Sequence, residues 1–503
     1  MGLVLLGARL RARQVSGRDG VPVSSEAPAV GRNLRPPSGP YGRGGRDTHT
    51  PPTVDHLAAD GFQAWRLQNA PNDSFEGHDV GERSPYSELR KDGSMSSSQN
   101  HPMRVLVCST AGAGHFSPLL PMARACAAAG HQLLVAAPAS FSDTVASSGL
   151  VHAPFDDVPA EVMGPIFGRL PSLSHDEANR VVIADIFGRL DAQAALPGMR
   201  DIVNDWGPDL ILREPCEFAS LALARQRGIA HATVAIGVRA MTDVVADMVA
   251  APLRELDELI GLPHGSCDVA MRTTTMFSTV PELLDGSSSA STHRYRNDPA
   301  NAIGQLPPAW GDPNHPLVYV SFGSVAGSLT SFKDLYRSIL DVLADQPIRV
   351  LLTTGHGLDP ADLGAAPANF RVEQWWPQAD VMPHAAAVIG HGGFGTTMSS
   401  LAAGVPQIVL PLFSLDQRLN AERIGAIGAG LALEPGEETM HVLPEAVRRV
   451  LSDTSFKDAA AAAANEIAEL APASQMVPLL ESLVAFNRGT AATATATATE
   501  KTP

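Results

Sequence analysis

Short apolar runs alternate with longer stretches of helical spacing through the middle of this chain. In the first half, the runs that predict buried strands lie at 104–108, 133–136, 209–212 and 232–235. Pro118 is suited to open the helix that follows the first run, and Gly130 is suited to end it. Runs that are apolar on both sides must be buried on both faces, so the alternation favours parallel sheets covered by helices.

A polar, proline-rich stretch interrupts the alternation, which then restarts with a second set of predicted strands. These lie at 317–322, 350–352, 387–389 and 407–410. We therefore expect an α/β protein with two doubly wound, Rossmann-like domains, at 103–290 and 317–487, joined by a linker at 291–316. Because doubly wound sheets bind ligands at the carboxyl ends of their strands, we expect the two domains to face a cleft.

Both ends of the chain lack this pattern. Residues 1–102 are rich in Gly, Pro, Ser and Arg without sustained periodicity, which predicts a disordered leader. Met95 and Met103 each precede the first predicted strand, so a translation start assigned too far upstream is an alternative. Residues 488–503 include an alternation of Ala and Thr and are expected to form a disordered tail.

Composition narrows the classes of partner. The 503 residues carry a formal net charge of −16, so neither nucleic acid nor an anionic membrane surface is an expected partner. No apolar run approaches the roughly 20 residues of a membrane span, so stable membrane insertion is not expected. The four cysteines are far apart and form no CxxC pair, which favours reduced thiols in a cytoplasmic protein. The sequence leaves monomer and homodimer open.

A glycine-rich turn, Gly112-Ala113-Gly114-His115, follows the first predicted strand. A dinucleotide-binding turn would need a third glycine where Ser117 stands, and the next strand ends without the acid that holds a ribose. We therefore expect Gly112 and Gly114 to let an acceptor molecule approach the backbone.

His115 lies at the mouth of the predicted sheet, where an imidazole can remove a proton from a hydroxyl group. Glu214, at the end of another predicted strand, could orient the ring and stabilise the imidazolium. Two alternatives stay open: Glu217 could take that role, or Glu214 could pair with Arg213 or cap a helix.

The second half holds groups suited to a nucleotide. Trp375-Trp376-Pro377-Gln378, at the end of a strand, offers flat aromatic faces for a base and an amide for a ribose. Ser324 lies in a strand-to-helix turn.

A second turn, His391-Gly392-Gly393-Phe394-Gly395-Thr396-Thr397, exposes N–H groups and hydroxyls that suit a diphosphate. Asp416 and Gln417 offer an acceptor and an amide for sugar hydroxyls. No D-x-D motif occurs, so no carboxylate-held metal is predicted.

These segments resemble the nucleotide-sugar signature of the family 1 glycosyltransferases. The resemblance runs from Glu373-Gln374-Trp375-Trp376-Pro377-Gln378 to Asp416-Gln417-Arg418-Leu419-Asn420-Ala421, and it is strongest for actinobacterial enzymes that glycosylate macrolides and other natural products. The segment Gly112 to Pro118 is similar to the acceptor-side motif of that family. Most of 103–487 is covered. The resemblance implies a GT-B fold and metal-independent, inverting transfer without a cofactor.

The resemblance also implies roles for single residues. His115 matches the general base, Trp375 the residue that stacks on the base, and Gln378 a residue near the ribose. Matches to diphosphate contacts are Ser324, His391, Gly393, Thr396 and Thr397, and Asp416 and Gln417 match the pair that reads the sugar hydroxyls.

Two positions depart from the family pattern. Plant members carry a ribose-binding Glu where this chain has Ser399, which weakens the case for a uridine donor and leaves thymidine open. Glu214 stands where the partner of the base is usually Asp.

The leading hypothesis is transfer of a hexose, preferably a deoxyhexose, from a dTDP- or UDP-sugar to a hydroxyl of a small hydrophobic natural product. One alternative is a nucleotide-sugar epimerase of the same fold. The other is an auxiliary, non-catalytic paralogue that binds the nucleotide sugar.

Overall fold

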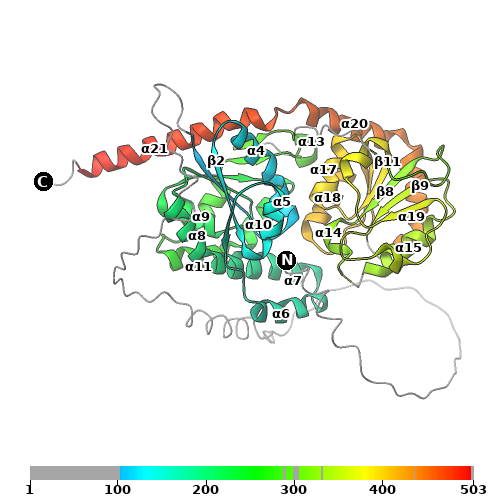
Figure 1. Cartoon of the computed structure of the whole chain (residues 1–503), viewed down its shortest axis with the longest axis horizontal. Coiled ribbons are helices and arrows are strands. Elements are labelled where there is room, and N and C mark those ends of the chain that lie inside the picture. The colour runs from blue at the N-terminus through cyan, green and yellow to red at the C-terminus, as the bar shows by residue number, and fades with distance from the viewer. Residues whose placement is uncertain (1–101, 287–290, 298–304, 330–331, 435–436, 500–503) are drawn as a thin grey trace, which may run out of the picture.

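The computed structural model describes residues 102–286, 291–297, 305–329, 332–434 and 437–499. Apart from Pro102, the predicted leader lies outside the described residues. The described chain forms two lobes, each built on a parallel sheet (Figure 1). The prediction of an α/β protein with two Rossmann-like domains is confirmed.

The first lobe contains a seven-stranded sheet in the order β3-β2-β1-β4-β5-β6-β7, and every printed pairing is parallel. The chain runs outward from β1 to one edge and then returns to extend the other, which is the doubly wound order. Its strands are β1 (Arg104–Cys108), β2 (Gln132–Pro138), β3 (His152–Phe155), β4 (Leu210–Arg213), β5 (Ala230–Val234), β6 (Met276–Ser278) and β7 (Thr292–Arg294).

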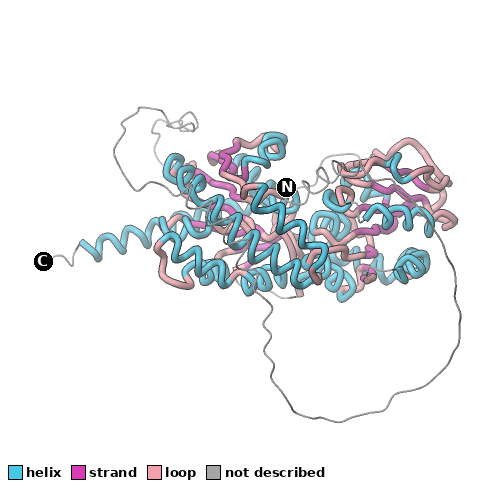
Figure 2. Tube along the Cα trace, turned by 90° about the horizontal axis from the view of Figure 1, so that it is seen from below, coloured by secondary structure: helices cyan, strands magenta, loops and turns pink. Residues whose placement is uncertain are grey.

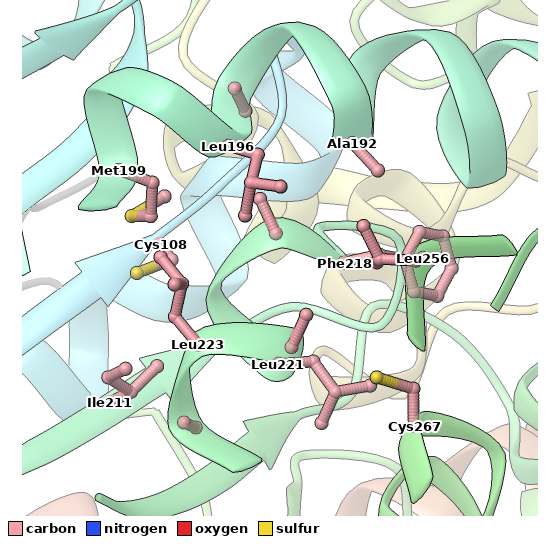
Figure 3. Close-up of a cluster of buried hydrophobic side chains, with 14 of the residues drawn as sticks. Cys108, Ala192, Leu196, Met199, Ile211, Phe218, Leu221, Leu223, Leu256 and Cys267 are labelled. Carbon is pink, nitrogen blue, oxygen red and sulfur yellow. The ribbon is translucent and has the colours of Figure 1, made fainter. Parts of the chain in front are cut away.

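Helices cover both faces of this sheet, which explains why its central strands are apolar on both sides. Alternate residues of β1 divide between two cores: Leu106 and Cys108 face one, and Val105 and Val107 face the other. Figure 3 shows the first of these cores, where Cys108 and Ile211 of the sheet lie near Met199 and Leu223 of the covering helices. The helices of this lobe are α3 (Ala113–Phe116), α4 (Leu120–Ala128), α5 (Ser142–Ser147), α6 (Ala160–Arg169), α7 (His175–Arg180), α8 (Ala192–Trp206), α9 (Ala219–Arg227), α10 (Arg239–Met248), α11 (Ala250–Ile260), α12 (Ser266–Thr273) and α13 (Glu282–Asp285).

Between α7 and α8 the chain forms a π-helix, η6 (Val181–Asp191). π-Helical turns are rare and are frequently found at functional sites.

The second lobe repeats the same winding with six parallel strands in the order β10-β9-β8-β11-β12-β13. The strands are β8 (Leu317–Ser321), β9 (Arg349–Thr353), β10 (Phe370–Glu373), β11 (Ala385–Gly390), β12 (Gln407–Val409) and β13 (Gly430–Ala432). The helices are α14 (Gly323–Ala326), α15 (Lys333–Leu343), α16 (Gln378–Val381), α17 (Phe394–Ala402), α18 (Leu415–Ala426), α19 (Glu437–Ser452), α20 (Thr454–Glu469) and α21 (Val477–Thr499).

The last helix returns to the first lobe (Figures 1 and 2). Leu480 and Val484 of α21 are buried in the core that contains β1 and β2, and Arg488 pairs with Asp209 at 2.6 Å. The predicted domain boundary at 487 was therefore wrong, because the segment after α20 packs on the first lobe. The predicted tail at 488–503 was also wrong as far as Thr499, where α21 ends. Alanine is the strongest helix former, so an Ala–Thr alternation can extend a helix that is already anchored.

The predicted linker at 291–316 is likewise divided between the lobes. Its first part supplies β7, the edge strand of the first sheet, and the buried Tyr295. Its last part packs on the second lobe, where Trp310 Nε1 donates to the Val350 carbonyl at 3.1 Å.

A shared apolar cluster joins the lobes beside the cleft. Val280 and Leu284 of the first lobe pack with Ala421 and Ile424 of α18 and with further residues of α17 and α20. Arg423 adds a hydrogen bond from its side chain to the Leu284 carbonyl at 2.5 Å. Among the helices described, none is both long and apolar enough to cross a membrane.

Candidate active site

A cavity of about 2100 Å³ lies between the lobes at the carboxyl ends of both sheets. His115 of the first lobe lines it together with Trp375, His391 and Asp416 of the second. The predicted cleft is therefore present, and it brings the imidazole of one half of the chain to the nucleotide-type groups of the other.

His115 contacts a buried carboxylate. Its Nδ1 lies 3.2 Å from Oε2 of Glu214, in an ion-pair contact that is not aligned as a linear hydrogen bond. Burial lowers the pKa of His115, but the charge of Glu214 outweighs this effect, so the net pKa is raised. The centroid of the Phe187 ring lies 5.2 Å from the centroid of the imidazole. Because Glu214 occupies the Nδ1 side, Nε2 is the nitrogen available to a hydroxyl group.

Gly112 and Gly114, the two predicted acceptor-side glycines, both line the cavity. A side chain at Gly112 would lie 3.2 Å from Cδ2 of His115, so glycine leaves room for the ring. Nothing lies within 4 Å of the position that a Cβ would take at Gly114, which leaves that backbone open to a ligand.

Glu214, and not Glu217, is the carboxylate at His115. Glu214 is fully buried, and it accepts the Cys216 N–H at 2.6 Å and the Thr110 N–H at 3.2 Å. Burial raises its pKa, but His115 and the hydrogen bond from the Cys216 N–H reverse the effect, so the net pKa is lowered and the group is ionised. Glu217 instead accepts N–H groups of Ala219 and Ser220 at the start of α9.

Arg213 explains how the Glu214 turn is held. Its buried guanidinium donates to the Glu217 carbonyl at 2.8 Å and to the Pro215 carbonyl at 2.9 Å. These bonds connect the end of β4 to the turn, so Arg213 braces the turn by bonding its backbone carbonyls.

A sulfur atom lies in the same cluster. The Nδ1 of His115, an oxygen of Glu214 and the Sγ of Cys216 lie within 4.8 Å of one another, a set that could hold a metal ion. Burial raises the pKa of the Cys216 thiol well above its usual value, which favours the protonated thiol. Because Glu214 contacts Nδ1 directly, we interpret this cluster as the support of the His115 ring.

The side chains of Trp375 and Trp376 have different environments. Trp375 lines the cavity and is 59% exposed, so its ring is available to a base. Gln378, which also lines the cavity, donates through Nε2 to the Thr396 hydroxyl at 2.9 Å. Trp376 is not among the cavity-lining residues: it packs in an apolar cluster with Leu317 and donates to the Gln305 carbonyl at 2.8 Å. We therefore correct the prediction for Trp376, whose side chain supports the wall.

His391 lies in the turn at 391–397 that the sequence predicts to bind a diphosphate. Burial lowers the pKa of His391 to about 4, so the ring is neutral at physiological pH and can offer a hydrogen bond without a charge. Ser324, Gly393, Gly395 and Thr396 line the same part of the cavity. Thr397 does not, because its side chain is almost fully buried and its hydroxyl has no hydrogen-bond partner in the described structure. The prediction that Thr397 contacts a diphosphate is therefore corrected. α17 begins at Phe394, and its turn directs the side chain of Thr396 toward the cavity and that of Thr397 inward.

Gly393→Ala tests how closely this turn is packed. The backbone of Gly393 has φ −62° and ψ 142°, which alanine can adopt, but the added methyl group would overlap the His391 ring. We expect a loss of about 1–3 kcal/mol of unfolding free energy, which is usual for overpacking, and weaker nucleotide binding. Urea denaturation and calorimetry measure the two effects. Gly425→Ala is the matched control, because nothing lies within 4 Å of the added methyl group. Unimpaired nucleotide binding by Gly393→Ala would contradict the assignment of this turn to the nucleotide.

Asp416 and Gln417 lie in the first turn of α18, on the far wall of the cavity. Burial raises the pKa of Asp416, against the opposing effects of Ser414 and His115. The side-chain carbonyl of Gln417 accepts the N–H groups of Leu412 and Phe413 at 2.8 and 3.1 Å. That amide therefore fixes the loop before the helix.

The rest of the cavity wall was not predicted residue by residue. Its apolar part comes from α6, η6 and α10. The apolar lining residues include Met163, Phe167, Ile183, Ile186, Phe187, Met241 and Val245. Their sequence signal is ordinary amphipathic helix, which does not distinguish a cavity wall from a core.

Comparisons with known proteins show the family to which the chain belongs. The models of the N- and C-terminal domains of "Erythromycin biosynthesis protein CIII-like" proteins match residues 124–271 and 337–483. The chain is 32% identical over 363 residues to an L-demethylnoviosyl transferase of Streptomyces niveus, covering 70% of this chain and 90% of that protein. The chain belongs to this family of glycosyltransferases.

Two further similarities cover almost the full length of the related proteins. A 10-deoxymethynolide desosaminyltransferase of Streptomyces venezuelae is 28% identical over 420 residues, covering 77% of this chain and 98% of that protein. The crystal structure of the glycosyltransferase VinC in complex with dTDP has a TM-score of 0.60 at 24% identity, covering 76% of this chain and 99% of that one. The latter similarity shows the shared GT-B fold. Membership of a glycosyltransferase family favours transfer over the epimerase and the non-catalytic alternatives.

Proposed function

We propose that this glycosyltransferase moves a hexose, preferably a deoxyhexose, from a dTDP-sugar to a hydroxyl group of a small hydrophobic natural product, with inversion and without a metal ion. The contact of His115 with Glu214 carries the proposal, because it places an oriented base in the cavity that Trp375, His391 and Asp416 also line. The S. niveus and S. venezuelae relatives, whose names describe sugar transfer, support the substrate class.

The chemistry follows from the two walls of the cavity. Nε2 of His115 takes the proton of the acceptor hydroxyl, whose oxygen attacks the anomeric carbon as the bond from that carbon to the diphosphate oxygen breaks. Glu214 stabilises the imidazolium that forms. The nucleoside diphosphate leaves with the bonding electrons, and the neutral His391 and the N–H groups of its turn meet the developing charge.

The donor preference rests on the cavity wall at Ser399. This residue lines the cavity where a ribose-binding carboxylate would stand in plant members of the family. A carboxylate at this position would bind the ribose 2′-hydroxyl of a uridine donor, which a thymidine donor lacks. Because Ser399 offers no carboxylate, we place dTDP-sugars before UDP-sugars. The dTDP bound to VinC is consistent with this order.

The acceptor class rests on the first lobe. Met163, Phe167, Ile186 and Phe187 give the acceptor side an apolar surface, and Phe187 contacts the His115 ring. Burial of apolar acceptor surface supplies affinity, while the single hydroxyl at His115 sets the position of transfer. Four buried, unpaired cysteines fit a reducing, cytoplasmic setting, which we also propose.

Mass spectrometry of the purified protein with dTDP- and UDP-hexoses and a panel of polyketide acceptors tests the proposal. We expect an acceptor product heavier by one sugar, formed faster from the dTDP donor and unaffected by EDTA. A changed sugar nucleotide without any acceptor would instead indicate an epimerase. Calorimetric binding of nucleotide sugars without product across the panel would indicate the non-catalytic alternative.

A further inference from the structure

Helix α18 has an incomplete N-terminus in its own lobe. Ser414 is the N-cap residue, but its side chain makes no capping hydrogen bond. The N–H groups of the first turn have no intrahelical partner, so the N–H of Leu415, the first helical residue, must be met from elsewhere.

The missing partner comes from the other lobe. Oδ1 of Asn179 accepts the Leu415 N–H at 3.0 Å, across 236 positions of sequence. Asn179 lies in α7, lines the cavity and is mostly buried. Its Nδ2 donates to the His175 carbonyl of the same helix at 2.7 Å, which fixes the orientation of the amide and points the oxygen at α18.

The helical run that carries Asn179 also contacts His115, the proposed general base. α7 begins with a capping box between Ser174 and Glu177, and it continues without a break into η6. Phe187 of η6 contacts the His115 ring. One continuous helical run therefore contacts both the ring of the base and the end of the helix that presents Asp416.

We propose that Asn179 is a positioning residue that caps α18 from the opposite lobe and so couples Asp416 and Gln417, the residues matched to sugar binding, to the lobe that carries His115. This inference rests on the proposed function and on the family resemblance that matches Asp416 and Gln417 to the pair that reads the sugar hydroxyls. When the cap forms, the sugar-binding wall is held opposite the base. When it is lost, the nucleoside diphosphate still has its whole site in the second lobe, but the sugar is held less firmly for transfer.

Asn179→Ala and Asn179→Asp separate the two hydrogen bonds of this side chain. Alanine removes both bonds, whereas aspartate keeps an oxygen for the Leu415 N–H and is an equally good cap, but cannot donate to the His175 carbonyl. Asp176→Ala is the control on the same helix, because Asp176 is exposed and contacts Arg418 only at 3.8 Å.

For Asn179→Ala we expect kcat/KM for the nucleotide sugar to fall by about 3- to 30-fold, the factor that corresponds to the free energy usually lost with a helix cap. Calorimetry should show weaker binding of the intact nucleotide sugar and unchanged binding of the nucleoside diphosphate. Product analysis should show a larger share of donor lost to hydrolysis. Asn179→Asp and Asp176→Ala should stay close to the unmodified protein in all three measurements.

Three results would overturn the proposal: no effect of alanine, equal impairment by aspartate and alanine, or equal weakening of both ligands. The second would assign the effect to the bond within α7, and the third to damage of the nucleotide site itself. If the unmodified protein transfers no sugar to any acceptor, the proposed function fails, but the two calorimetric titrations still decide whether Asn179 acts on the sugar-binding wall.

Discussion

His115→Ala should lower kcat by about 10²- to 10⁴-fold, the usual contribution of a general base. The Kd for nucleoside diphosphate should stay unchanged, because the residues that we assign to the nucleotide all lie in the second lobe. Alanine removes the ring and its contact with Glu214 but leaves the turn at Gly112 and Gly114 in place. Single-turnover kinetics and calorimetry with dTDP measure the two quantities.

The control for this change is His264→Ala, which removes an exposed imidazole outside the cavity. It should have normal turnover. Normal turnover in His115→Ala would remove the general base from the proposed mechanism, and a parallel loss of dTDP binding would show that the substitution had disturbed the whole cleft.

The sequence predicted the parts of the fold that depend on local pattern. The central strands β1 and β8 are continuous apolar runs, because each is buried on both faces, and the turns that follow them carry the residues of the cleft. Motif and fold agree here for a physical reason: the carboxyl ends of parallel strands collect the loops of one sheet at a single edge.

The parts that could not be predicted depend on contacts between distant segments. Nothing in the pattern of α21 indicates that Leu480 packs beside β1, since an amphipathic helix can cover either lobe. The sequence also could not distinguish the roles of adjacent residues of the same type. Trp375 and Trp376, like Thr396 and Thr397, have the same chemistry, and only the direction of the backbone decides which member of each pair faces the cavity. Asn179 carries no motif, because its role arises only when α7 meets α18.

The carboxylate behind the base gives a prediction with a distinct pH signature. Only the neutral imidazole can accept a proton, so kcat/KM should rise with pH as His115 loses its own proton. Glu214 opposes the effect of burial and raises the pKa of His115, which places this rise at higher pH. Glu214→Gln removes that charge, so the rise should move to lower pH. The plateau should fall by about 10²-fold or more, because an amide can hold the ring in the wrong tautomer and cannot stabilise the imidazolium.

Glu217→Gln distinguishes this effect from general damage. Both carboxylates are buried in the same turn, but Glu217 bonds to the N–H groups that begin α9, whereas Glu214 contacts His115. Glu217→Gln should therefore lower stability while leaving the position of the pH rise unchanged. A Glu214→Gln profile that lost height without moving along the pH axis would show that the carboxylate braces the turn and does not set the basicity of the ring. A shift in both variants would indicate that His115 responds to the summed charge of the turn and not to one partner.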